Sequence, residues 1–132
     1  MRFIPTKLHA PLDYVVGAVL IVGPWIFQYS DSTAATTISI VLGIGLIAYS
    51  LLTNYELGVW KVAPMAVHNL IDIVAGALLA ASPWLFGFAD DGTQFWLPFV
   101  VIGVAAIFLG LTTKQSGGYS YRKADTPTPA AG

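Results

Sequence analysis

The chain has 132 residues, of which 56% are hydrophobic and only 10% are charged, and its mean hydropathy is +0.73. About a quarter of the residues in an ordinary soluble domain are charged, so this composition excludes a soluble globule. It also excludes a disordered chain, which would be polar. The net charge of −1 argues against nucleic-acid binding, which needs clustered lysine and arginine. Because the sequence has no cysteine, disulfides, thiolate metal sites and cysteine nucleophiles are excluded too.

The sparse charges leave four long apolar stretches, which predict membrane-spanning helices near residues 9–29, 34–53, 66–88 and 93–113. A spanning helix needs about 20 apolar residues, and each stretch has about that length. The stretches lack the alternation of a β-barrel strand. We therefore predict an all-α protein, a bundle of four transmembrane helices over residues 1–114.

The basic residues predict how this bundle is oriented. All six lie at the ends of the chain or between the second and third spans, whereas the two opposite turns carry only acidic residues. The positive-inside rule then places both termini in the cytoplasm. The first span lacks a cleavage site of small residues and is expected to be a retained helix. Residues 115–132 are rich in Gly, Pro, Thr and Ser and predict a disordered cytoplasmic tail.

The sequence contains two copies of one helical hairpin, repeat one over residues 2–54 and repeat two over residues 61–114. A shift of 59 positions superimposes polar residues, prolines and a tryptophan as well as apolar residues. The matched pairs include Pro5 and Pro64, His9 and His68, Asp13 and Asp72, Gly17 and Gly76, Pro24 and Pro83, and Trp25 and Trp84. Past one inserted residue the shift becomes 60, which pairs Gly43 with Gly103 and Thr53 with Thr113. Two spans return the chain to its starting side, so a pseudo-twofold axis along the membrane normal is expected.

Residues 82–88, with the sequence SPWLFGF, and residues 23–27, with the sequence GPWIF, resemble the SPW repeat family of small bacterial membrane proteins. That family is named for a Ser-Pro-Trp motif in the first helix of a two-helix unit. The resemblance covers about residues 5–114, although Gly23 stands where the motif has serine. It implies a multi-pass protein of the bacterial cytoplasmic (inner) membrane and implies no particular activity.

The Pro-Trp pairs lie in the outer third of the first and third predicted spans. Pro24 and Pro83 are expected to bend or end their helices, because proline removes a backbone hydrogen bond. Trp25 and Trp84 are expected to anchor the outer membrane interface, where amphipathic rings settle. The alternative is an aromatic pocket for a lipid tail, a quinone or a carotenoid.

The only two histidines each precede an aspartate by four residues, which gives the pairs His9/Asp13 and His68/Asp72. At this spacing each pair lies on one helix face, and that face also carries a small glycine. Charge exposed to lipid is costly, so both pairs are expected to face the bundle interior. Repeat symmetry places them at one depth, near the cytoplasmic edge.

Three interpretations of this cluster remain open. The first is a structural clamp, in which the histidines bond to the aspartates across the pseudo-twofold axis or within their own helix. The second is a cofactor site, either for zinc, iron or manganese or for a haem with His9 and His68 as axial ligands. The third is a titrating pair in a proton or ion pathway, which would depend on water or on the hydroxyls of Ser39, Ser50 and Ser82.

Phosphate loops, serine-nucleophile elbows and HExxH motifs are missing from the sequence. We therefore expect a structural or accessory protein, not an enzyme, that holds no cofactor and contacts the lipid bilayer. Self-association and association with a larger membrane complex stay open, and nucleic acid is not an expected partner. The alternative function is metal or cofactor binding, or proton or ion translocation, at His9, Asp13, His68 and Asp72.

Overall fold

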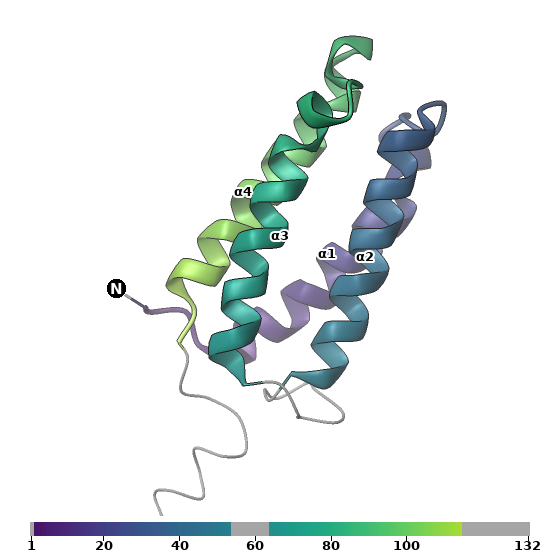
Figure 1. Ribbon diagram of the computed structural model, residues 1–132. Coiled ribbons are helices and arrows are strands. Elements are labelled where there is room, and N and C mark those ends of the chain that lie inside the picture. Colours follow the sequence, from purple (N-terminus) through teal and green to yellow (C-terminus); the bar gives the residue numbers. More distant parts are fainter. Residues whose placement is uncertain (1, 54–63, 115–132) are drawn as a thin grey trace, which may run out of the picture.

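The structure is a computed structural model that describes residues 2–53 and 64–114. These residues form four long helices and no strand, which confirms the predicted all-α fold (Figure 1). The helices are α1 (Thr6–Ile26), α2 (Thr33–Leu52), α3 (Met65–Leu85) and α4 (Leu97–Thr112), with short 3-10 helices η1 (Ala89–Asp91) and η2 (Thr93–Phe95) before α4. Helices α1, α2 and α3, and the segment Thr93–Thr112 that contains η2 and α4, are long and apolar enough to cross a membrane. The predicted tail, residues 115–132, lies outside the described residues.

The helices pair in chain order as two antiparallel hairpins, α1 with α2 and α3 with α4 (Figure 1). Each hairpin crosses at a matched pair of glycines. A Cβ atom on Gly17 would lie 3.1 Å from the carbonyl oxygen of Gly43, and one on Gly76 would lie 2.6 Å from that of Gly103. Glycine at these positions lets the two backbones approach so closely. The sequence repeat is therefore also a repeat of helix packing.

The N-terminal segment closes the bundle by bonding to the end of α4. The amide of Ile4 donates to the carbonyl of Thr112 at 3.0 Å, and the amide of Lys114 donates to the carbonyl of Ile4 at 2.8 Å. Arg2 Nη1 donates to the carbonyl of Gly110 at 2.8 Å, so the guanidinium satisfies one of the last carbonyls of the helix. Residues 2 and 114 consequently lie at the same end of the bundle, as an even number of spans requires.

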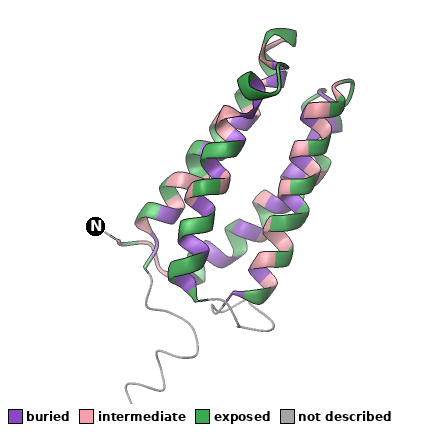
Figure 2. Cartoon of the chain, viewed as in Figure 1, coloured by how far each residue is buried: buried purple, intermediate pink, exposed green. Residues whose placement is uncertain are grey.

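Figure 2 shows that the helices have exposed faces, and these faces carry many large apolar side chains. Val15, Val41, Val74 and Val101, one on each helix, expose 57–62% of their surface. Apolar surface of this extent needs to be covered. Together with the helix lengths, it indicates contact with a lipid bilayer.

The Pro-Trp motif lies in the last turn of the first helix of each hairpin. The amide of Tyr29 donates to the carbonyl of Pro24 at 2.9 Å, and the amide of Phe88 donates to the carbonyl of Pro83 at the same distance. The residue just before each aromatic has a left-handed backbone, with φ of 63° at Gln28 and 76° at Gly87. These features define a helix C-cap that turns the chain back on itself. Consequently α1 and α3 end three residues before the predicted ends at 29 and 88.

The aromatic residue after each cap folds back into the core. Tyr29 and Phe88 are buried and lie 5.0 and 5.1 Å, between ring centroids, from the ring of Phe99. Trp25 and Trp84 point outward instead, exposing 62% and 59% of their surface. Pro24 and Pro83 lie inside their helices, two residues before the helix ends at Ile26 and Leu85, so that they end or bend these helices stays a prediction. Outward indoles are compatible with interfacial anchors and do not form an enclosed aromatic pocket.

The fourth span, Thr93–Thr112, begins at the predicted residue, although the α-helix α4 within it begins only at Leu97. The preceding residues fold into η2, and Gly92 before it has a φ of 140° that favours glycine. This irregular turn holds the residue inserted in repeat two relative to repeat one.

The tyrosine hydroxyl explains why repeat one departs from the Ser-Pro-Trp pattern. A Cβ atom on Gly23 would lie 2.5 Å from Tyr29 Oη, so a side chain does not fit there. Repeat two has phenylalanine in place of this tyrosine, and Ser82 occupies the position that matches Gly23. The Ser82 hydroxyl donates to the carbonyl of Leu79 at 2.7 Å. The serine of the motif and the tyrosine hydroxyl thus compete for one space.

This competition predicts a non-additive pair of substitutions. Gly23→Ser alone should lower the free energy of unfolding by about 1–3 kcal/mol, because it overpacks the core. In the Tyr29→Phe background the same change should cost clearly less. Thermal unfolding in detergent measures both effects. Gly45→Ser is the matched control, since a Cβ atom at Gly45 meets nothing within 4 Å. Equal costs of Gly23→Ser in the two backgrounds would refute the competition.

Candidate functional site

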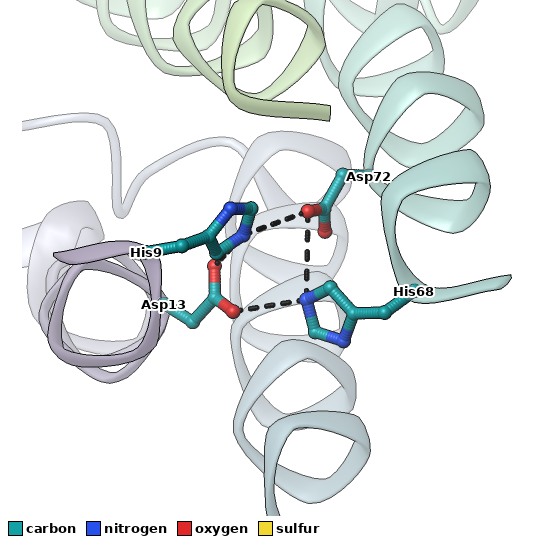
Figure 3. Close-up of side chains that lie close together, drawn as sticks. All are labelled: His9, Asp13, His68 and Asp72. Carbon is teal, nitrogen blue, oxygen red and sulfur yellow. Dashed lines mark ion pairs between the residues drawn. The ribbon is translucent and has the colours of Figure 1, made fainter. Parts of the chain in front are cut away.

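The structure brings His9 and Asp13 of α1 together with His68 and Asp72 of α3 (Figure 3). The histidines are completely buried, and the aspartates expose only 4% and 6% of their surface. One ligand atom from each side chain lies within 4.8 Å of the others. We call these four residues the His/Asp cluster. It lies at the end of the bundle that also holds residues 2 and 114.

Matched prolines set the helical register of the histidines. Pro5 and Pro64 occupy the N-cap positions of α1 and α3, with extended backbones. The amides of His9 and His68 donate back to the carbonyls of these prolines at 3.3 and 3.1 Å. Each aspartate follows one turn later on the same face. Because the local sequence is repeated, two equivalent His/Asp pairs lie at one interface.

Each imidazole contacts both carboxylates through its Nε2 atom. His9 Nε2 lies 3.0 Å from Asp13 Oδ1 and 3.0 Å from Asp72 Oδ2. His68 Nε2 lies 2.9 Å from Asp13 Oδ2 and 3.4 Å from Asp72 Oδ2. The contacts within each helix and those across the pseudo-twofold axis are therefore both present. The cluster belongs equally to the two hairpins.

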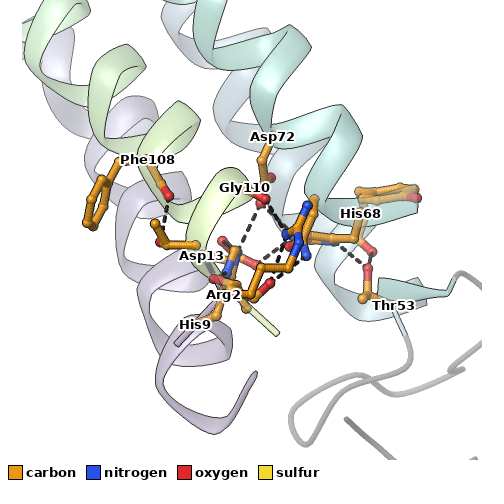
Figure 4. Close-up of polar contacts among 12 residues, drawn as sticks. Arg2, His9, Asp13, Thr53, His68, Asp72, Phe108 and Gly110 are labelled. Atoms are coloured by element: carbon orange, nitrogen blue, oxygen red, sulfur yellow. Dashed lines mark hydrogen bonds and ion pairs between the residues drawn. The ribbon is translucent and has the colours of Figure 1, made fainter. Parts of the chain in front are cut away.

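Two threonines complete the site, and the sequence analysis did not assign them to it. The Nδ1 atom of His9 lies 2.6 Å from Thr113 Oγ1, and that of His68 lies 2.6 Å from Thr53 Oγ1 (Figure 4). Thr53 and Thr113 are completely buried and cap the C-termini of α2 and α4. Each threonine contacts the histidine of the other repeat. The available signal was their exact match in the repeat, at the C-terminal ends of the second helix of each hairpin.

The direction of the hydrogen bond that the Thr53 hydroxyl donates indicates which ring nitrogen of His68 carries a proton. The Thr53 hydroxyl donates its hydrogen to the carbonyl of Tyr49 at 2.8 Å, so Oγ1 accepts from His68 Nδ1. The Tyr49 ring stacks on the imidazole, with centroids 5.1 Å apart and planes inclined by 24°. His68 Nδ1 therefore carries a proton, and the ring orientation is held from two sides.

The aspartates also form the floor of a cavity of about 60 Å³ between the hairpins. Its other lining residues are apolar, with Leu20 and Leu79 among them. Ser39 and Ser82, which were candidates for a relay above the cluster, donate their hydroxyl hydrogens to the carbonyls of those same leucines. The third candidate, Ser50, is completely buried.

A bis-histidine haem does not fit the described geometry. The rings of His9 and His68 meet edge to face, with centroids 5.4 Å apart. No porphyrin plane can lie between rings in such contact. The four side chains do lie close enough together for one ligand atom from each to reach a single metal ion.

Removing the Thr53 hydroxyl tests the outer contacts of the cluster. Thr53→Val keeps the side-chain shape but leaves the buried Nδ1–H of His68 without its acceptor, which should cost about 1–3 kcal/mol of stability. Thr112→Val is the control, because the Thr112 hydroxyl bonds at an exposed position to the carbonyl of Phe108 (Figure 4). Unfolding in detergent should separate the two variants. An equal effect of both substitutions would contradict the assigned bond.

Comparison with known proteins shows to which family the chain belongs. No curated protein and no solved structure shows a significant match to the chain. The model of the SPW repeat domain matches residues 7–113, which include both hairpins and the whole His/Asp cluster. The family and the four apolar helices together indicate a multi-pass membrane protein. The chain belongs to the SPW repeat family.

Proposed function

We propose that this chain is a structural or accessory membrane protein, not an enzyme, whose His/Asp cluster joins two similar hairpins. One observation carries the proposal. Each imidazole Nε2 lies within 3.0 Å of a carboxylate oxygen of the other repeat, at 3.0 Å for His9 with Asp72 and 2.9 Å for His68 with Asp13. The cluster is therefore a buried polar connection between hairpins that pack internally through their own glycines, and it adds to the bonds of residues 2–4 with the end of α4.

Burial makes this connection specific. An isolated buried charge or polar group is costly, whereas a paired group is tolerated. Separation of the hairpins would leave all four side chains without the partners they find across the interface. The cluster therefore favours one arrangement of the hairpins over the many that matching apolar surfaces allow.

A proton or ion pathway has less support from the described residues. The cavity above the aspartates is lined by apolar side chains apart from the aspartates themselves. Ser39 and Ser82 have their hydroxyl hydrogens engaged by backbone carbonyls. Neither serine offers a proton relay toward the outer side.

The clamp predicts that histidine is needed for stability. His9→Ala combined with His68→Ala should lower the free energy of unfolding by about 3–5 kcal/mol, because both buried carboxylates lose their partners. Ser82→Ala is the control, since that hydroxyl bonds within its own helix at the outer end. Thermal unfolding in detergent provides the measurement. A double variant as stable as the parent protein would contradict the proposed clamp.

We further propose that the protein lies in the bacterial cytoplasmic membrane with the His/Asp cluster near the cytoplasmic side. The basic residues support this orientation. The apolar outward faces also offer contact surface to a second copy or to a larger membrane complex.

The absence of native cysteine makes the orientation directly testable. Asp31→Cys, in the exposed turn between α1 and α2, should react with a membrane-impermeant maleimide in intact spheroplasts. Lys114→Cys, exposed at the opposite end, should react only after the membrane is permeabilised. The reverse labelling pattern would contradict the proposed orientation.

A further inference from the structure

We propose that the His/Asp cluster binds one divalent first-row transition-metal ion. This inference rests on the proposed function, because the same four side chains join the hairpins. It adds a ligand to the clamp, namely an ion held equally by both repeats.

The donor set suits such an ion. Imidazole nitrogen together with carboxylate oxygen binds zinc, iron and manganese in proteins. Two carboxylates balance the charge of one divalent cation, so the loaded site is neutral when both imidazoles are neutral. Neutrality matters in a cluster this deeply buried, where an uncompensated charge is costly.

The spacing of the donors is also suitable. The four contacts between Nε2 and carboxylate oxygen atoms measure 2.9, 3.0, 3.0 and 3.4 Å. Bonds of about 2.0–2.1 Å in tetrahedral geometry place neighbouring ligand atoms about 3.3–3.4 Å apart. All four donor atoms lie within 4.8 Å of one another, so an ion can enter the centre once the short contacts widen and the longer separations shorten. Figure 3 shows the four side chains converging from two helices on this common centre.

The orientation of His68 provides an independent argument. Its Nδ1 carries the proton donated to Thr53, so a neutral ring directs its Nε2 lone pair at the carboxylates. An unshielded lone pair 2.9 Å from a carboxylate oxygen of Asp13 needs a positive charge between the two atoms. A proton on Nε2 supplies that charge in the clamp, and a metal ion supplies it in the loaded site. Histidine ligands commonly donate their second ring N–H to such an outer acceptor.

The cavity gives the ion one accessible side. Asp13 and Asp72 line it from below, and its volume of about 60 Å³ can accommodate water. A small exogenous ligand, such as a water molecule, can thus complete the coordination from the cavity.

The test uses the full-length protein, purified in detergent, stripped with a chelator and titrated with Zn²⁺ or Co²⁺. We expect one equivalent to bind per chain, with visible d–d absorption typical of low-coordinate Co²⁺. Asp72→Asn and His68→Gln should each weaken Zn²⁺ binding at least 100-fold, and Thr53→Val should weaken it by about 10–100-fold. Ser39→Ala, a buried change outside the cluster, should bind Zn²⁺ as the parent protein does.

Wild-type protein keeps the proposal testable even if the cluster variants do not fold. X-ray absorption of the zinc-loaded protein should show nitrogen and oxygen ligands at about 2.0–2.2 Å, with the outer scattering of imidazole. Absence of stoichiometric binding, a shell without imidazole, or full affinity in folded Asp72→Asn would overturn the metal site. Stripped protein that keeps its stability yet binds no zinc would overturn the metal and leave the clamp standing. Failure of the proposed clamp would be seen in a different measurement, because the histidine variants would then be as stable as the parent protein.

Discussion

The contact of two imidazoles with two carboxylates across the hairpin interface is the constraint on which the rest of the structure depends. Lipid-facing apolar surface gives two hairpins no reason to prefer one mutual arrangement, because lipid tails are as apolar as the side chains. Buried polar groups do impose a preference, since each must find its partner. His9 and His68 reach the carboxylates of both repeats, so the cluster is complete only when the two hairpins meet in one register. The threonines reinforce this register because each binds the histidine of the other repeat.

The repeat turns this single constraint into a nearly symmetric bundle. At the end of the bundle that holds residues 2 and 114 the His/Asp cluster joins the hairpins, and at the opposite end Tyr29 and Phe88 both pack on Phe99. The left-handed caps at Gln28 and Gly87, just after the Pro-Trp motifs, make this second contact possible, because they turn the following aromatic inward. The apolar cavity lies between these two contacts. The Pro-Trp motifs of the family thus lie at one end of the interface between the hairpins, and the His/Asp cluster lies at the other end.

Much of this organisation follows from the sequence, because polar residues inside a membrane are constrained in where they can point. The four helices, the parallel repeat and the meeting of His9, Asp13, His68 and Asp72 could all be predicted from spacing and apolar context. The helix ends could not, since they depend on a left-handed cap at Gln28 and Gly87 that no residue pattern required. The repeat matches Thr53 with Thr113, but their contact with the histidines could not be predicted, because only the tertiary structure brings their hydroxyls to the imidazoles.

A double-mutant cycle between His9→Ala and Asp72→Asn tests the central claim most directly, because these side chains come from different hairpins and lie 3.0 Å apart. The free energies of unfolding of the parent, the two single variants and the double variant would be measured in one detergent. A cross-hairpin contact predicts a coupling energy of at least about 1 kcal/mol between the two positions. Additive effects, with coupling within error of zero, would contradict a cluster that holds the hairpins together.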